Sequence, residues 1–223
     1  NFMKNGGYRV VRSASPSWSS GEKSKGKYDF SSMYKYLGWL DSINARSYDM
    51  VTYGNGLIYP PERGMDGTEP WPEWEKTQPQ THDSIWGYAK YTNALAEKVE
   101  DPIGFELWNE PNHYTEDTPV KAQKYCDYVK PTRVYLNYNG HDTIDLAPFS
   151  LAYNDEINFV DYCFKYGLYP YFNSIAHHPY VWEGGFTSTR LQEYRMDQIE
   201  DLILKYGGWK DREITEIGYP TTT

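Results

Sequence analysis

The most constraining feature of the sequence is a regular alternation of short apolar segments with longer segments of helical periodicity. Strands are predicted at 8–14, 47–54, 103–108, 143–150, 172–180 and 212–220. Helices are predicted at 28–44, 81–99, 118–133, 155–167 and 190–208, with the third ending in a break at Pro131. Strict alternation favours a parallel sheet, because neighbouring parallel strands are joined by crossovers of helical length.

Two architectures are possible for such a sheet, an open doubly wound sheet and a closed (β/α)8 barrel. A doubly wound sheet usually carries a glycine-rich phosphate turn after its first strand, whereas "SASPSWSSGEK" (13–23) follows here. A barrel gathers its chemistry at the carboxyl ends of several strands. Polar groups do stand at or just past predicted strand ends, namely Arg12, Asn109, Glu110, His178 and Glu216. The sequence therefore favours one α/β domain over 1–223, a TIM barrel.

The predicted strands are too few for a barrel of eight. The first and the last strand would be the missing ones, so we expect the chain to be an excerpt of a longer protein. The chain opens on "NFMKNGGYRVV" without an initiator methionine or a cleavable apolar segment, and no signal peptide is recognised.

Composition limits the function further. The net charge is −9, and basic residues are scattered apart from "GEKSKGK" (21–27), a predicted solvated loop. Nucleic-acid binding is therefore not expected, and no apolar run has the length of a membrane span. Cys126 and Cys163 fall in predicted helices and are expected to be buried free thiols. No spacing of cysteines or histidines indicates a metal site, and protein partners are not indicated.

Two carboxylates stand in similar settings. Glu110 ends the predicted strand "FELWNE", and Glu216 lies in "EITEIGYP". A glutamate at a strand end, taken alone, is usually a solvated loop residue. Paired carboxylates at the mouth of a barrel fit glycoside hydrolysis, in which one donates a proton and the other attacks the anomeric carbon. Their surroundings must then drive the two pKa values apart.

Other polar residues at strand ends would complete such a site. Asn109 can bind a sugar hydroxyl near the reacting carbon. His178 and Tyr180 can donate hydrogen bonds to a carboxylate, and Arg12 can hold one ionised. As isolated residues, the histidine, the tyrosine and the arginine have ordinary structural explanations. Their coincidence at several strand ends favours a shared site.

Aromatic residues are unusually abundant, with 23 Tyr and 8 Trp. Such rings stack on sugars, but they also pack cores, and both interpretations stay open for each residue. The long predicted loop at 55–80 indicates an extended cleft for a polymer. The candidates for sugar stacking are Trp18, Tyr53, Trp108 and Trp182, followed by Trp71 and Trp74.

The motifs "WNEPN" (108–112) and "TEIGYPT" (215–221), in this order, resemble clan A of the glycoside hydrolases. "VVRSASPSW" (10–18) and "IAHHPY" (175–180) resemble the second and sixth strands of that clan's barrel. Family 39, the group of β-xylosidases and α-L-iduronidases, is the most similar, and "KGKYDFSSM" (25–33) also resembles it. The resemblance extends over nearly the whole chain.

This resemblance implies that Glu110 is the general acid/base and Glu216 the nucleophile of a retaining glycosidase. Asn109 would contact the 2-hydroxyl, and Arg12 and Tyr180 would support Glu216, with His178 on the same wall. The implied substrate is a β-linked plant or microbial polysaccharide or oligosaccharide, and no cofactor is needed. An enzyme of this kind is expected to be bacterial and secreted or attached to the cell surface.

Two alternatives belong to other classes. A carbohydrate-binding pseudoenzyme would have the same cleft without turnover, although the presence of both carboxylates argues against it. A hydrolase with a serine nucleophile is disfavoured, because the sequence contains no GxSxG motif.

Overall fold

The computed structural model describes residues 9–60, 78–99, 102–113, 116–152, 156–178 and 189–215. One sheet has four parallel strands in the order β1 (Val10–Ala14), β4 (Arg46–Val51), β5 (Gly104–Leu107) and β6 (Asp145–Pro148). A second parallel sheet consists of β7 (Ser174–His177) and β8 (Asp211–Ile214). A bridge between Leu151 and His177 connects the second sheet to the end of β6.

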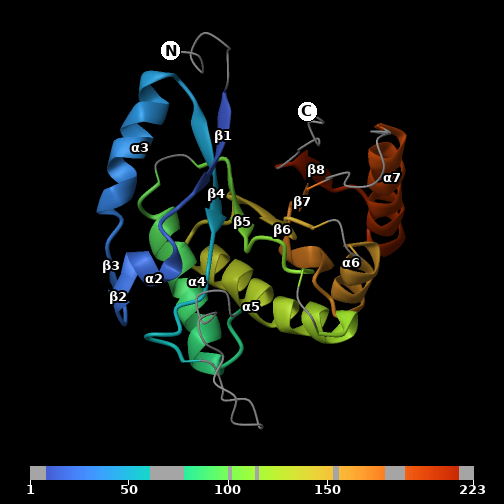
Figure 1. Cartoon of the computed structure of the whole chain (residues 1–223), viewed down its shortest axis with the longest axis horizontal. Coiled ribbons are helices and arrows are strands. Elements are labelled where there is room, and N and C mark those ends of the chain that lie inside the picture. The colour runs from blue at the N-terminus through green and yellow to red at the C-terminus, as the bar shows by residue number, and fades with distance from the viewer. Residues whose placement is uncertain are drawn as a thin grey trace, which may run out of the picture.

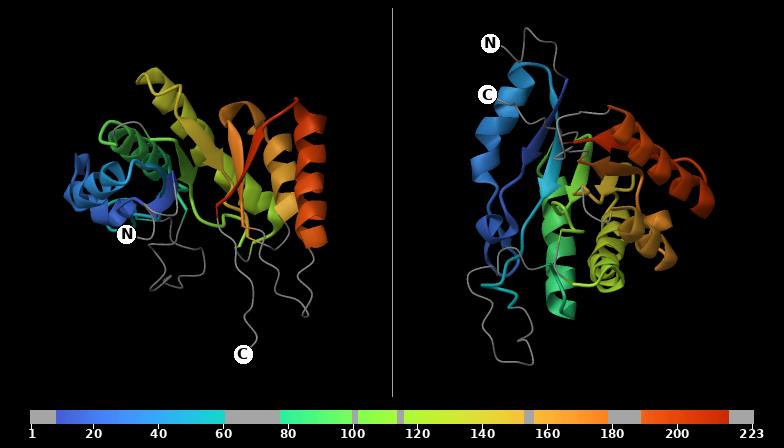
Figure 2. Two further views of the ribbon diagram at one scale, coloured as in Figure 1. Left: turned by 90° about the horizontal axis from the view of Figure 1, so that it is seen from above. Right: turned by 45° about the vertical axis from the view of Figure 1, so that its right-hand side comes forward.

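Helices connect successive strands and form an arc outside them (Figures 1 and 2). The long helices are α3 (Ser31–Ser42), α4 (His82–Ala96), α5 (Thr118–Tyr138), α6 (Glu156–Lys165) and α7 (Thr189–Tyr206). The short elements are α2 (Trp18–Gly21), the strands β2 (Glu22–Ser24) and β3 (Lys27–Tyr28), and the 3-10 helix η2 (Tyr169–Tyr171).

Each predicted strand and helix corresponds to an element of this structure, and the prediction of parallel strands is confirmed. Strands that follow one another in sequence are neighbours in space, with helices on one side, which is a TIM-barrel-like arrangement. Among the described residues, the two parallel sheets do not close into a barrel. The fold class is therefore shown to be α/β and parallel.

The predicted end of the third helix is wrong, because α5 does not break at Pro131 but continues to Tyr138. A proline inside a helix destabilises it by about 3 kcal/mol through a lost hydrogen bond and a steric clash. Residues on both sides of the proline, Val129 and Leu136, are fully buried against the rest of the core. Burial of two such side chains contributes roughly 1.5–3 kcal/mol each, which offsets the cost of the proline.

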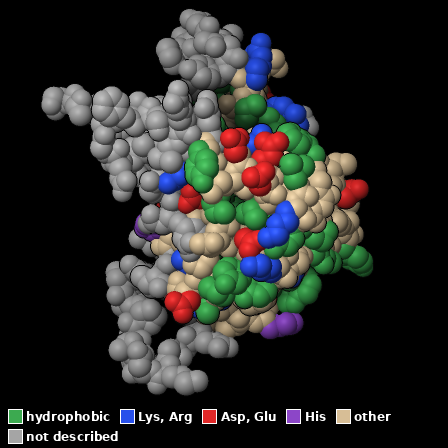
Figure 3. All heavy atoms as spheres, turned by 90° about the vertical axis from the view of Figure 1, so that its right-hand side faces the viewer, with side chains coloured by type: hydrophobic (Ala, Val, Ile, Leu, Met, Phe, Trp, Pro, Cys, Tyr) green, Lys and Arg blue, Asp and Glu red, His purple; other side chains and the backbone are tan. Residues whose placement is uncertain are grey.

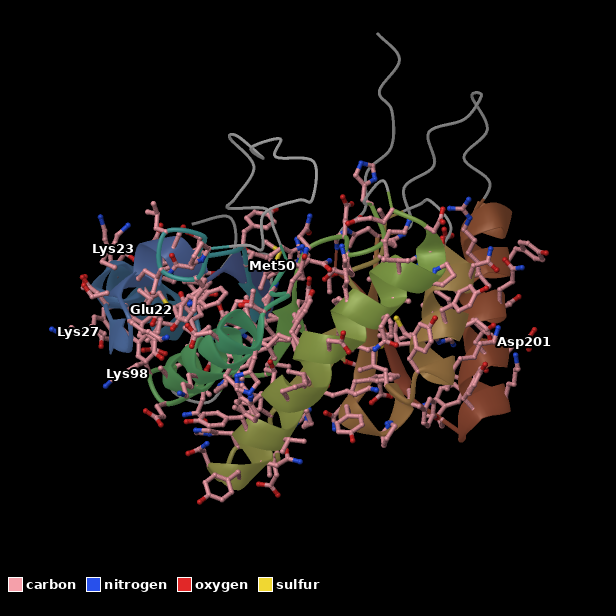
Figure 4. All side chains as sticks on the ribbon, turned by 90° about the horizontal axis from the view of Figure 1, so that it is seen from below. Glu22, Lys23, Lys27, Met50, Lys98 and Asp201 are labelled. Atoms are coloured by element: carbon pink, nitrogen blue, oxygen red, sulfur yellow. The ribbon has the colours of Figure 1, made fainter. Side chains whose placement is uncertain are left out.

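The prediction of a solvated loop at 21–27 is wrong, because residues of this segment form the hairpin β2–β3. Glu22 is fully buried, and its carboxylate accepts hydrogen bonds from the backbone N–H of Gly26 (2.6 Å), the hydroxyl of Tyr59 (3.0 Å) and the indole of Trp18 (2.5 Å). Figure 4 shows Glu22 turned inward while Lys23 points away from the molecule. The buried carboxylate explains why a charged segment becomes ordered.

A second polar cluster lies among the strands near their amino ends. Ser174 on β7 donates a hydrogen bond to Asp145 on β6 (3.0 Å to Oδ2), and the hydroxyl of Tyr48 lies 3.2 Å from that of Ser174. Glu213 on β8 is hydrogen-bonded to Asp145. Burial and the neighbouring Asp145 carboxylate raise the pKa of Glu213 to about 7, and burial raises the pKa of Asp145. The two acids therefore share a proton in the folded protein.

This cluster makes stability depend on pH. Between the ordinary pKa of Glu213, 4.5, and its folded value of about 7, the folded protein holds a proton that the unfolded chain releases. Stability from this group is therefore lost as pH rises through this window. His177 acts in the opposite direction, because burial lowers its pKa from 6.5 to about 4 and its contribution is lost as pH falls.

The measurement must separate these two contributions. We expect the unfolding temperature of the wild type, relative to that of the Glu213→Gln variant, to fall as pH rises from about 4.5 to about 7. Both proteins contain His177, so its contribution cancels. Parallel curves for the two proteins over this window would contradict the shared proton.

The described surface shows no patch of a single charge sign on the face seen in Figure 3, where acidic and basic side chains are interspersed. Lys165 and Lys205, for example, both pair with Asp161 (2.6 and 3.0 Å). Among the described helices, none has the length and apolar character needed to cross a membrane. Cys126 and Cys163 are free and buried between α5 and α6, as predicted.

Candidate active site

The end of β5 has an unusual backbone. Trp108 and Glu110 have positive φ angles of 76° and 49°, and at the end of the neighbouring β6 Phe149 and Ser150 have φ angles of 96° and 34°. Residues other than glycine rarely adopt this region, and such strain clusters at functional sites. The backbone N–H of Glu110 donates to the carbonyl of Ser150 (3.0 Å). This hydrogen bond joins the strained segments that follow β5 and β6.

A buried ion pair lies beneath these strand ends. The guanidinium of Arg12, on β1, donates from Nε to Oε1 of Glu106 (2.9 Å) and from Nη2 to Oε2 (2.7 Å). The side chain of Glu106 is fully buried and that of Arg12 is 19% exposed. The hydroxyl of Ser150 donates to the same carboxylate. This two-pronged geometry fixes the direction of the arginine.

Arg12 in turn contacts two supporting residues of the candidate site. Its Nη2 donates to Oδ1 of Asn109 (3.2 Å) and lies 3.4 Å from Nε2 of His178. Nδ1 of His178 lies 3.2 Å from Oε1 of Glu110. The structure therefore brings together Arg12, Asn109, Glu110 and His178, four predicted site residues from three strands and the segments after them. His178 is buried, whereas the side chain of Glu110 is 27% exposed and open to a ligand.

The last residue of the "WNEPN" motif has a structural task. Asn112 is buried, and its side-chain amide makes two hydrogen bonds with the backbone of Ala152, accepting from N–H (2.9 Å) and donating to the carbonyl (2.8 Å). Its own carbonyl accepts a hydrogen bond from Lys121 (3.0 Å). Asn112 thus connects the segments that follow β5 and β6, and with them Glu110 and Ser150.

Several predicted site residues lie outside the described part of the chain, namely Glu216, Tyr180, Trp182, Trp71 and Trp74. The described chain ends at Thr215, whose backbone N–H donates to the carbonyl of His177 (3.3 Å). Arg12, predicted to support Glu216, pairs with Glu106 among the described residues.

Two predictions of sugar-stacking residues are wrong. Trp18 and Trp108 are 1% and 0% exposed, so no ligand reaches their faces. Trp108 packs at an angle against Tyr88 and Tyr128, with ring centroids 6.2 and 5.9 Å apart. Both tryptophans therefore belong to the hydrophobic core. Tyr53 is half-buried and meets Trp108 edge-on, and its role in binding stays a prediction.

Glu106 and Ser150 were not among the predicted site residues. The signal for Glu106 was present, because a carboxylate in the middle of the apolar run "IGFELW" (103–108) must have a charged partner if that run is buried. Ser150 gave no such signal, since a serine after a strand is common in loops. Its contact with Glu106 exists only in the folded chain.

Comparison with solved structures gives a consistent result. The chain is similar to a family 39 glycoside hydrolase from the gut symbiont Bacteroides cellulosilyticus WH2, with 20% identity and a TM-score of 0.74 over 97% of this chain. It is also similar to the GH39 enzyme from Xanthomonas axonopodis pv. citri, with 16% identity and a TM-score of 0.66 over 99% of this chain. The chain has the fold of family 39 glycoside hydrolases. The resemblance to clan A is thereby confirmed for the fold.

A third solved structure extends this likeness. A monomeric β-xylosidase from Caulobacter crescentus CB15 has 13% identity and a TM-score of 0.64 over 99% of this chain. The chain spans less than half the length of these three structures, covering 45%, 47% and 48% of them. No family model matches the sequence, and no curated protein matches it either.

Proposed function

We propose that this protein is a retaining glycoside hydrolase with Glu110 as the acid/base and Glu216 as the nucleophile. The observation that carries the proposal is the position of Glu110. It lies past the end of β5, partly exposed, with its carboxyl beside His178 from the end of β7. Asn109, its neighbour, is held by Arg12 from β1. The proposed proton donor and the proposed sugar-binding amide are thus adjacent, past the carboxyl end of a strand, which is where barrel enzymes have their active sites.

In the proposed mechanism, Glu110 first protonates the leaving oxygen while the Glu216 carboxylate attacks the anomeric carbon. The bond to the leaving group breaks and a covalent glycosyl-enzyme forms. Glu110, now a carboxylate, then removes a proton from water, which attacks the same carbon and releases Glu216. A retaining enzyme of this type has its carboxyl groups about 5–5.5 Å apart. In the described residues, no cluster of three or more candidate metal ligands is present.

The proposed substrate is a β-linked sugar in a plant or microbial polysaccharide or oligosaccharide. One solved structure of similar fold is described as a β-xylosidase, which makes β-xylosides the first aryl glycosides to assay. A panel of β-glycosides and polysaccharides assayed with the full-length protein would identify the sugar.

Azide tests the role of Glu216. In the Glu216→Gly variant, azide fits the space of the lost carboxylate and attacks the anomeric carbon directly. A single displacement inverts the configuration, so a β-glycoside substrate should give an α-glycosyl azide. The product anomer is read by NMR. An unchanged rate in Glu216→Gly would refute this assignment, and a wild type that binds sugars without hydrolysing any would indicate a carbohydrate-binding pseudoenzyme.

A further inference from the structure

Glu106 is placed to influence the active site without touching a substrate. Its side chain is fully buried, and both carboxylate oxygens accept hydrogen bonds from Arg12, with Nε–Oε1 at 2.9 Å and Nη2–Oε2 at 2.7 Å. Oε2 also accepts from the hydroxyl of Ser150. A carboxylate with these partners and no exposure is neither an accessible acid nor a nucleophile. Any effect on catalysis must pass through Arg12 or Ser150.

The first route runs through side chains. Arg12, held by Glu106, directs Nη2 at Nε2 of His178 (3.4 Å). An arginine only donates hydrogen bonds, so a neutral His178 ring avoids two opposed N–H groups at this contact when its proton is on Nδ1. That Nδ1–H then donates to Oε1 of Glu110 (3.2 Å). The direction of the arginine thus selects the histidine tautomer that donates to Glu110.

The second route runs through the backbone. Ser150 donates from its hydroxyl to Glu106 and accepts at its carbonyl from the N–H of Glu110 (3.0 Å). Ser150 and Glu110 both have positive φ angles, 34° and 49°. These conformations persist only where surrounding contacts hold them. The hydrogen bond from Ser150 to Glu106 is one such contact, and it lies on the buried side of the site.

We propose that Glu106 is a positioning residue that orients the carboxyl of Glu110 through Arg12 and His178 and its backbone through Ser150. This inference rests on the proposed role of Glu110 as the acid/base. It differs from a purely structural role, in which Glu106 would only neutralise Arg12 and stabilise the fold. The two roles predict different effects on protonation of the leaving group.

Leaving groups separate the two roles. An activated leaving group, such as dinitrophenolate, departs without a proton donor, whereas a poor one needs a well-placed acid. In the full-length protein, we expect Glu106→Gln to lower kcat/KM for a poor aryl leaving group about 10²-fold, the effect of a misplaced catalytic group. For the dinitrophenyl glycoside, kcat/KM, which reports only the first step, should change little. Ser150→Ala should act in the same direction, more weakly, because it interrupts one route only.

The matched control is Glu22→Gln. Glu22 is also a fully buried carboxylate that accepts several hydrogen bonds, but its partners are Trp18, Gly26 and Tyr59, which surround the hairpin β2–β3. This variant should lose stability while keeping the leaving-group dependence of the wild type. Equal loss on all leaving groups in Glu106→Gln would overturn the proposal. If that variant does not fold, a wild-type leaving-group dependence in Ser150→Ala would overturn the backbone route.

The tautomer of His178 gives a readout without turnover. Nitrogen NMR of the wild type over a pH series should show that the neutral ring carries its proton on Nδ1. A neutral ring with its proton on Nε2 would overturn the side-chain route. If no aryl glycoside is turned over by the wild type, the proposed function fails, while this measurement still decides whether Arg12 fixes the histidine.

Discussion

Glu110→Ala is expected to lower kcat/KM for glycosides with poor leaving groups by about 10²–10⁴-fold, the usual contribution of a general acid. For a dinitrophenyl glycoside the first step needs no acid and should remain fast. Without the base, water then attacks the glycosyl-enzyme slowly, so steady-state turnover should be preceded by a burst of released phenol. Stopped-flow absorbance of the released phenolate measures both phases.

Azide distinguishes this variant from the nucleophile variant. In Glu110→Ala, azide attacks the glycosyl-enzyme and needs no base, so turnover should recover. Two successive inversions give a β-glycosyl azide, the opposite anomer from that expected of Glu216→Gly. Glu116→Ala is the matched control, since Glu116 is a nearby glutamate that is 39% exposed and pairs with Lys124. The assignment of Glu110 would be refuted if Glu110→Ala gave no β-glycosyl azide. It would also be refuted if Glu110→Ala and Glu116→Ala had equal effects on activity.

Arg12→Leu is expected to destabilise the fold by about 3–5 kcal/mol, the usual effect of removing one partner of a buried ion pair. The reason is the fate of Glu106, which has no exposed surface and would retain an uncompensated charge. Ser150 donates one hydrogen bond to that carboxylate, which does not replace a guanidinium. The free energy of unfolding from urea denaturation measures the loss.

Two controls test the physical reason. The double variant Arg12→Leu with Glu106→Leu removes both charges and should recover most of the stability. Lys25→Met breaks the ion pair with Asp83, whose side chains are 59% and 62% exposed, and should cost less than about 1 kcal/mol. A loss in Arg12→Leu as small as that in Lys25→Met would mean that water reaches Glu106.

The structure also changes the meaning of the aromatic excess. The sequence left each ring open to core packing or sugar stacking, and burial assigns Trp18 and Trp108 to the core. Trp108 packs at the base of the strained segment that presents Glu110. A reduction in ligand affinity on changing Trp108 would therefore reflect a displaced Glu110 and not a lost stacking surface.

The sequence by itself determined the order of strands and helices and the parallel sheet, because periodicity and β-branched composition are local properties of the chain. It also indicated Arg12, Asn109, Glu110 and His178, since polar residues after apolar strands are visible as a pattern. It placed the break at Pro131 wrongly, because a local helix preference does not include the burial of Val129 and Leu136 on either side.

Only the tertiary structure decided how the site residues contact one another. The pairing of Arg12 with Glu106, and that of Ser150 with the same carboxylate, join residues on three strands or their ends that are far apart in the sequence. The tautomer of His178 follows from these contacts and from no local pattern. Hydrogen bonds and ion pairs depend on distances of a few ångströms, which periodicity does not encode. The contacts among the site residues were therefore decided by side-chain packing and not by the order of the strands.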